Sequence, residues 1–256
     1  MNSMESTVLI VILNYGTYEL TLKLVTELHR KLDYNRYSIM VIDNCSPNES
    51  AEILSENSKE LNYIFYANKK NAGYAVGNNI GIRYAIDHDY KYTWILNNDI
   101  ELREENILSE MVRVMDEREN VGCIGSKIYN ADGSICAPYC RRPSLWSMTL
   151  GIFSDKKYRI SRQEVFDEVY RVYGCSMLLN NKAMNEVDCM DERTFLYGEE
   201  GILSERLIRK GYKTYYDPKV SITHLGSMSM KKASSDSKKR QALEMEKSRE
   251  LYLREY

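Results

Sequence analysis

Short apolar runs alternate with helical patterns through the first half of the chain. Thr7–Leu13 is an apolar run, and the next segment, Glu19–Lys31, has apolar residues at helical spacing. This alternation repeats three more times before a last apolar run at Val121–Ile128. Runs without polar alternation are typical of strands buried on both faces, so the pattern predicts a parallel sheet covered by helices. The other predicted strands are Tyr37–Ile42, Leu61–Tyr66 and Tyr92–Leu96, and the other helices are Ala51–Lys59, Ala75–Asp87 and Glu104–Glu117.

The second half of the chain is less regular. Asn130–Gly133 is a hairpin turn signal, and Cys140–Phe166 has no clear period and is interpreted as a loop with a short helix. A helix is predicted over Glu199–Lys210, with Gly211 at its end. The predicted strands of this half are Arg171–Leu179, Lys213–Tyr216 and Val220–His224.

No segment has the glycine and proline content of a flexible linker. We therefore expect residues 1–230 to form one domain, with a regular half at 1–128 and a mixed half at 129–230. The tail, residues 231–256, is polar at first and then has an amphipathic helical pattern.

Polar side chains directly follow three of the predicted parallel strands. They are Asn14-Tyr15, Asp43-Asn44 and Asn97-Asn98-Asp99. Asn and Asp are also good turn residues, so any one of these sites has a purely structural explanation. Ligands of open parallel sheets bind at the carboxyl ends of the strands, and three such ends together favour a binding site.

The chain lacks the glycine-rich loops that cradle phosphate groups. No GxxxxGK[ST] motif is present, and no GxGxxG follows the first strand. The segment Asn71–Asn79 has two glycines at a suggestive spacing, but it follows the third strand rather than the first, which argues against a dehydrogenase. A diphosphate ligand would then need another counter-charge, and Asp99 could hold one Mg²⁺ or Mn²⁺ through hard oxygen ligands.

Composition and charge narrow the class of protein. The 256 residues are 43% hydrophobic and carry 35 basic and 37 acidic side chains, a net charge of −2. This charge excludes a protein whose whole surface is basic and binds nucleic acid. The six cysteines form no CxxC pair and are interpreted as reduced thiols of a cytoplasmic protein without a signal peptide. Tyrosine is in excess, with 21 Tyr against 4 Phe and 2 Trp.

Seven short motifs follow one another along nearly the whole chain: Ile10–Tyr15, Val41–Ser46, Asn71–Gly81, Leu96–Asp99, Gly174–Leu179, Phe195–Glu200 and His224–Gly226. In this order they resemble the inverting GT-A glycosyltransferases of family 2. The likeness is greatest to the rhamnosyltransferase-like branch of bacterial polysaccharide assembly. Each motif is weak by itself, and their order carries the resemblance.

The resemblance implies an α/β fold of the GT-A type, with a Rossmann-like nucleotide-binding parallel sheet and a mixed acceptor-side part. Residues 1–128 would bind a UDP- or dTDP-linked sugar, and residues 129–230 would face the acceptor. Asp99 would bind Mg²⁺ or Mn²⁺, and His224 would reach the metal or the diphosphate, although a histidine that only ends a strand is an equal alternative. The implied donor-binding residues are Asn14, Tyr15, Asp43, Asn79, Asn97 and Asn98.

The general base is where the chain departs from the family pattern. The family has Glu-Asp at the start of a helix with Asp as the base, whereas this chain has Glu199-Glu200. A further acidic residue that is usual two positions later is replaced by Ile202. Glu200 is therefore the expected base and Glu199 its alternative, while two acidic residues could also simply complement the helix dipole.

The expected function is transfer of a single sugar from a nucleoside diphosphate donor to a hydroxyl of a saccharide or lipid-linked acceptor. The alternative is a non-catalytic nucleotide- or sugar-binding module that has lost its base. Arg141, Arg142 and Trp146 are candidates for acceptor contacts or for ordinary surface-loop residues. Of the tyrosines, only Tyr15, Tyr74 and Tyr197 lie within motifs expected to line the cleft.

The tail has alternatives of its own. Residues 231–256 carry 8 basic and 5 acidic side chains, a balance of +3, with apolar residues at helical spacing. Such a helix could lie on an anionic membrane surface, so a peripheral position at the inner face of the membrane is one expectation. A solvated terminal helix and a homodimer contact are the other two.

Overall fold

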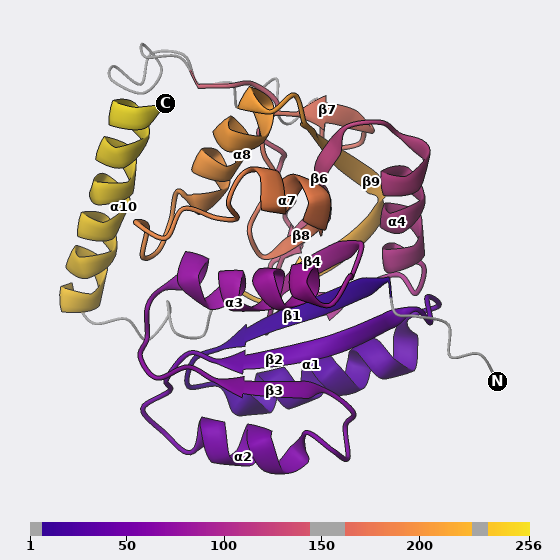
Figure 1. Ribbon diagram of the computed structural model, residues 1–256, viewed down its shortest axis with the longest axis vertical. Coiled ribbons are helices and arrows are strands. Elements are labelled where there is room, and N and C mark those ends of the chain that lie inside the picture. The colour runs from indigo at the N-terminus through magenta and orange to yellow at the C-terminus, as the bar shows by residue number, and fades with distance from the viewer. Residues whose placement is uncertain (1–6, 144–161, 227–234) are drawn as a thin grey trace.

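The protein, described here from a computed structural model, is built on one nine-stranded sheet with helices on both faces (Figure 1). The structure describes residues 7–143, 162–226 and 235–256, and side chains of the last segment from residue 242 onward. The strands are β1 Val8–Asn14, β2 Tyr37–Asp43, β3 Ile64–Ala67, β4 Tyr92–Asn97, β5 Ile100–Leu102, β6 Val121–Asn130, β7 Asp167–Val169, β8 Ser176–Asn180 and β9 Lys213–His224. The helices are α1 Tyr18–Lys31, α2 Ser50–Asn57, α3 Tyr74–Asp87, α4 Ile107–Glu117, α7 Asn181–Glu186, α8 Glu199–Arg209 and α10 Ser235–Glu255.

The strand order is β3-β2-β1-β4-β8-β6-β9-β5, and β7 pairs with β9. Strands β3, β2, β1 and β4 are mutually parallel, as the alternating pattern predicts. β8 lies between β4 and β6 and is antiparallel to both. The expected α/β fold, a parallel sheet with a mixed part, is therefore confirmed. The strand expected at Val121–Ile128, which is β6, does not lie next to β4, because β8 is inserted between them.

In the second half of the chain, the strand boundaries expected from the sequence differ from the structure in two places. The strand expected at Arg171–Leu179 begins only at Ser176, because the preceding residues form a loop. The two short strands expected in the segment 213–224 are one strand, β9. Its pairing with β6 shifts in register between Ser126 and Lys127, and such an irregularity breaks the period of two that a continuous strand would show.

Two hydrophobic layers enclose the sheet. One layer packs α1, α2 and α4 against the sheet, and the other packs α3, α7 and α8 against the opposite face. Helix α3 approaches β1 closely at Gly77 and Gly81, where an added Cβ would lie 2.6 Å from Leu13 and 2.5 Å from Val11. Gly77 and Gly81 therefore serve helix–strand packing, and no phosphate loop is needed to explain them.

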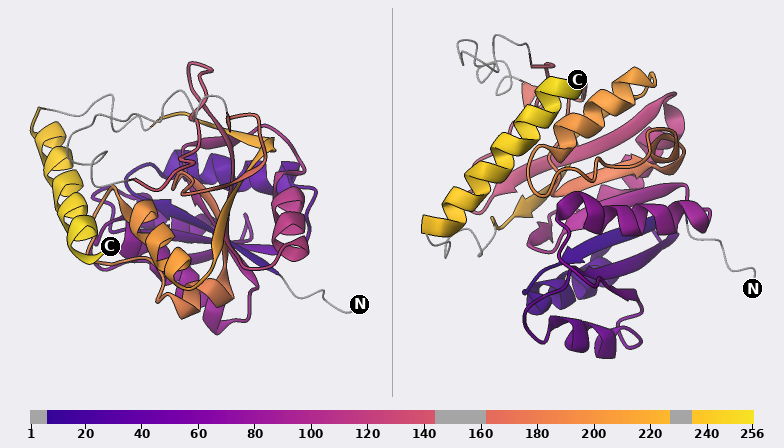
Figure 2. Two further views of the ribbon diagram at one scale, coloured as in Figure 1. Left: turned by 90° about the horizontal axis from the view of Figure 1, so that it is seen from above. Right: turned by 60° about the vertical axis from the view of Figure 1, so that its left-hand side comes forward.

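The C-terminal helix α10 docks on the domain beside α8 (Figure 2). Tyr252 donates a 2.7 Å hydrogen bond to Glu205 of α8, and Arg209 bonds the carbonyl of Glu255 at 2.8 Å. Leu251 is buried in this contact, whereas Leu243 and Leu253 are exposed. Within the described ranges, no helix combines the length and the apolar character that crossing a membrane requires.

Candidate functional site

The carboxyl ends of β1, β2 and β4 meet at one edge of the sheet. Asn14 lies in register with Asp43, and Leu13 lies in register with Asn97. Asn14 Nδ2 donates a 2.8 Å hydrogen bond to Asp43 Oδ1, and both residues are buried. Parallel pairing thus brings together the polar residues that the sequence marks at three separate strand ends.

A hydrogen-bond network fixes the loops at this edge. Asp43 also accepts bonds from Ser46, at 2.9 Å from the backbone nitrogen and 2.5 Å from the hydroxyl. Asn98 Nδ2 lies 2.8 Å from Thr17 Oγ1 and 2.9 Å from Thr21 Oγ1, so it ties the end of β4 to the start of α1. The side chains of Asp43 and Asn98 therefore already form hydrogen bonds within the protein.

Tyr15 and Asn97 differ from the network residues in their exposure. Tyr15 directly follows β1 and is 51% exposed, which leaves its ring face open to a ligand. Asn97 is half-buried, and its backbone nitrogen bonds the carbonyl of Cys175 at 3.0 Å. At this edge, Tyr15 and Asn97 are the expected donor-binding residues that are at least partly exposed and whose side chains form no hydrogen bond of the network.

Asn79 is not part of this edge. Its amide bonds the carbonyl and the backbone nitrogen of Met190 at 2.9 and 3.0 Å, and Glu192 Oε1 at 3.0 Å. The side chain is fully buried, because it clamps α3 to the loop before α8. Asn79 thus fixes this loop, and its expected part in positioning the donor stays a prediction.

Asp99 and His224 lie together although 125 positions separate them. The antiparallel pairing of β5 with β9 places Ile100 opposite His224, and Asp99 directly precedes Ile100. His224 Nε2 is 3.2 Å from Asp99 Oδ1. The geometry is not that of a hydrogen bond, and among the described residues this buried nitrogen has no hydrogen-bond partner.

This pair fits a divalent cation. An imidazole nitrogen without a partner beside a carboxylate oxygen offers two converging ligand atoms. In the ranges that the structure describes, no group of three or more His, Cys, Asp or Glu side chains is arranged to hold a metal ion. The protein would therefore supply two ligands, and phosphate oxygens and water would supply the others, as is usual for Mg²⁺.

Glu200 stands near this edge at the start of α8. Its Oε1 accepts a 3.0 Å hydrogen bond from the backbone nitrogen of Gly174, and Tyr74 donates a 2.6 Å bond to the carbonyl of Gly174. The next residue, Cys175, accepts the bond from Asn97 at the end of β4. One short segment thus connects the Glu200 carboxylate to the strand ends.

Glu199 differs sharply from its neighbour. The side chain is 2% exposed, and within the described segments its Oε1 has no hydrogen-bond partner. Burial, together with repulsion from Glu200, raises the pKa of Glu199 to about 8. Glu199 is therefore largely protonated at neutral pH and unsuited to accept a proton there, whereas Glu200 reaches a cavity.

Replacing Glu199 by Gln should flatten the pH dependence of stability. Between the usual carboxyl pKa of 4.5 and the folded value of about 8, the folded protein keeps a proton that the unfolded chain releases. The free energy of unfolding of the wild type therefore falls as the pH rises through this window. Gln mimics the protonated form, so Glu199→Gln should exceed the wild type by at least about 1 kcal/mol at pH 8.5 and match it near pH 5.

Urea unfolding at both pH values measures this difference. Glu168→Gln is the control, because Glu168 is an exposed residue of β7 paired with Lys213. It should leave the pH dependence unchanged. Parallel pH profiles for Glu199→Gln and the wild type would show that Glu199 is ionised in the folded protein.

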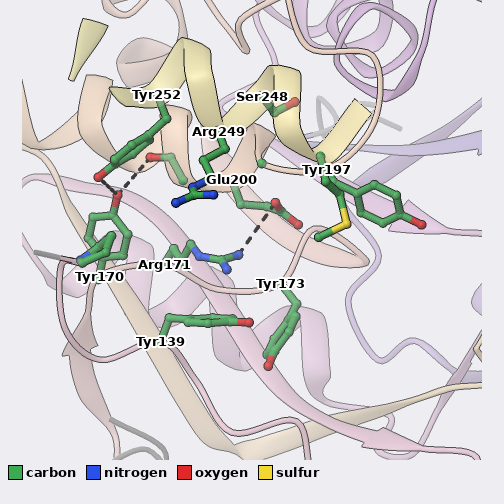
Figure 3. A pocket seen from close by; sticks show the side chains of 13 residues that line it. Tyr139, Tyr170, Arg171, Tyr173, Tyr197, Glu200, Ser248, Arg249 and Tyr252 are labelled. Carbon is green, nitrogen blue, oxygen red and sulfur yellow. Dashed lines mark hydrogen bonds and ion pairs between the residues drawn. The ribbon is translucent and has the colours of Figure 1, made fainter. Parts of the chain in front are cut away.

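Five tyrosines line a cavity of about 410 Å³ beside Glu200 (Figure 3). The cavity lies between the start of α8, the segment before β8 and the docked helix α10. Glu200 and Arg171 also line it, with Arg171 Nη1 3.8 Å from Glu200 Oε2. The five tyrosines are Tyr139, Tyr170, Tyr173, Tyr197 and Tyr252.

Sequence reasoning selected only one of these tyrosines, Tyr197. The tyrosine excess was a signal for the other four, but no local motif distinguishes them. Tyr74 is not part of the cavity lining, and its hydroxyl donates a hydrogen bond to the carbonyl of Gly174. Arg142 does not enter the cavity, because it pairs with buried Glu205. Trp146 lies outside the described residues.

The fold and the strand-end site define the class of protein. The solved structure of the mannosyltransferase PcManGT from Pyrobaculum calidifontis, in complex with GDP-Man and Mn²⁺, matches 99% of the chain with a TM-score of 0.68 and 12% identity. GalNAc-T7 with UDP, GalNAc and Mn²⁺ matches 96% of the chain, with a TM-score of 0.68 and 17% identity. The chain therefore has the GT-A glycosyltransferase fold.

The chain belongs to glycosyl transferase family 2, whose family model matches residues 7–187. A curated relative, the low-salt glycan biosynthesis hexosyltransferase Agl10 of Haloferax volcanii, is 24% identical over 192 residues, or 75% of this chain. The chain spans 58% of the length of that relative, 66% of PcManGT and 48% of GalNAc-T7.

Proposed function

We propose that this chain is a metal-dependent, inverting glycosyltransferase of the hexosyltransferase type. It would move a single sugar from a nucleoside diphosphate donor to a hydroxyl of a saccharide or lipid-linked acceptor in polysaccharide assembly. The observation that carries the proposal is the position of the Glu200 carboxylate. It lines the cavity on one side and is joined through Gly174 and Cys175 to the strand-end edge on the other.

The donor would lie along the strand-end edge. The exposed ring of Tyr15 would stack on the base, and the Asp43 network would hold the loops that shape this part of the cleft. Asp99 and His224 would hold Mg²⁺ or Mn²⁺. When bound, the ion supplies positive charge that neutralises the departing diphosphate.

Glu200 would act as the general base. The acceptor oxygen attacks the anomeric carbon from the face opposite the diphosphate, and its proton passes to the Glu200 carboxylate. The bond from the anomeric carbon to the diphosphate oxygen breaks, and the nucleoside diphosphate leaves with the electron pair. This direct displacement inverts the anomeric centre in one step.

The longer side chain of Glu200 is accommodated locally. The Gly174 nitrogen holds one oxygen at 3.0 Å, and an added Cβ at Gly174 would lie 2.8 Å from that oxygen. A side chain at this position would displace the Glu200 oxygen from the backbone, so glycine lets the glutamate lie against it. This contact supports Glu200, rather than the buried Glu199, as the base.

A donor screen tests the proposal. We expect one of UDP, dTDP or GDP to raise the melting temperature in the presence of Mn²⁺, and its hexose conjugates to release the nucleoside diphosphate slowly. GDP is included because PcManGT was solved with GDP-Man. Stabilisation without release, in the presence of varied saccharide acceptors, would favour the non-catalytic binding module. No stabilisation by any nucleotide would contradict both functions.

A further inference from the structure

The tyrosine-lined cavity contains two guanidinium groups that the proposed chemistry does not use. Arg171 precedes β8, and Arg249 belongs to the docked helix α10. Figure 3 shows the two side chains entering the same space from different walls, with Glu200 beside them. The charged residues of the lining are Arg171, Arg249 and Glu200, so the cavity has two positive groups and one negative group.

Arg171 is held in an orientation suited to ligand recognition. Its guanidinium carbon lies 3.6 Å from the centroid of the Tyr139 ring, so the face of the group is stacked. Among the described residues its side chain donates no hydrogen bond, and its ion pair with Glu200, at 3.8 Å, is longer than a hydrogen bond. A stacked guanidinium whose in-plane donors face a cavity is an arrangement that binds planar or tetrahedral anions bidentately.

Arg249 lines the same cavity. It pairs with Glu246 one turn earlier on α10 at 3.5 Å, and both side chains are about half exposed. An exposed ion pair of this kind is weak, so an anion in the cavity can compete with it.

The rest of the wall suits a sugar ring. The hydroxyls of Tyr170 and Tyr252 bond each other at 2.8 Å and both bond Glu205, which fixes these two rings in place. Fixed aromatic faces pack against the apolar faces of pyranose rings. The volume of about 410 Å³ falls in the range of small-molecule sites, about 300–1,000 Å³.

We infer that this cavity is the acceptor site and that the acceptor is a saccharide carrying an anionic group, a phosphate or a carboxylate. The ring lies among the tyrosines, and the anion pairs with Arg171 and Arg249, which directs a ring hydroxyl toward Glu200. Helix α10 is then a wall of the acceptor site. The identification of this cavity as the acceptor site rests on the proposed function, but binding of an anionic saccharide can be measured without donor or turnover.

The test compares the binding of glucose, glucose 1-phosphate and glucuronate by saturation-transfer NMR, without metal or nucleotide. The wild type should bind at least one of the two anionic sugars about five- to tenfold more tightly than glucose. Preference for the phosphate alone, for the carboxylate alone or for both identifies the anion. Arg249→Gln should remove most of this preference.

Arg254→Gln is the matched control, because Arg254 is on the same helix, 72% exposed and outside the cavity lining. It should retain the preference. Equal binding of the three sugars, or an unchanged preference in Arg249→Gln, would overturn the inference. Nucleotide binding is measured separately, so a failure of the donor screen leaves this result interpretable and a failure here leaves the proposed transferase function standing.

Discussion

Glu200→Gln is expected to lower the rate of sugar transfer by about 10²–10⁴-fold, the usual contribution of a general base. Gln retains the shape of Glu and can still accept the bond from the Gly174 nitrogen, so the start of α8 should keep its structure. The amide cannot take the proton from the acceptor hydroxyl. Donor binding should therefore match that of the wild type, because Glu200 faces the cavity rather than the strand-end edge.

Initial rates of nucleoside diphosphate release in the presence of acceptor measure this loss, and nucleotide titration measures donor binding. Glu200→Asp should lose less than Glu200→Gln, because it keeps a carboxylate although about 1 Å farther away, a displacement that can cost about 100-fold. Exposed Glu168→Gln should keep the full rate. Unchanged turnover in Glu200→Gln would assign the base to another residue.

Asp99→Asn is expected to abolish Mn²⁺-dependent nucleotide binding and to lower transfer by at least about 100-fold. The substitution removes the negative charge of one of the two proposed protein ligands, so the bound diphosphate loses most of its counter-charge. Excess chelator should reduce the wild type to the same level. Added Mn²⁺ should restore the wild type and leave Asp99→Asn inactive.

Calorimetric titration of Mn²⁺ with the stabilising nucleotide present measures this effect. Asp89→Asn is the matched control, because Asp89 is an exposed residue with a φ of 60°, a conformation that Asn adopts equally well. It should bind metal and nucleotide as the wild type does. Full activity of the wild type in chelator would contradict the assignment of Asp99 to a metal site.

The parallel half of the fold could be predicted from the sequence because its signals are local. Each of the first four apolar runs is long enough to bury a strand, and each is followed by a helix-length pattern. The polar residues at the ends of β1, β2 and β4 follow those runs directly. Since parallel strands end at one edge, Asn14, Asp43 and Asn97 could be placed together without a structure.

The finer roles of these residues could not be predicted in the same way. The sequence gives no sign that Asn79 bonds Met190, or that the Asp43 oxygens are occupied by Asn14 and Ser46. Hydrogen-bond partners of buried polar groups depend on packing between segments that are far apart in the chain. A residue type that suits a ligand suits such a structural contact equally well.

The sequence by itself determined the order of the motifs, the parallel nucleotide-binding half and the acidic pair at the start of α8. Only the tertiary structure decided that Asp99 meets His224, that Glu199 is buried while Glu200 faces a cavity, and that α10 closes this cavity. The tyrosine excess, too, could be related to a cavity only from the tertiary structure. The physical reason is that the cavity is assembled from four separate segments, which the insertion of β8 and the docking of α10 bring together. Side chains from such distant segments share no period along the chain. The tyrosines that these segments supply are Tyr139, Tyr170 with Tyr173, Tyr197 and Tyr252.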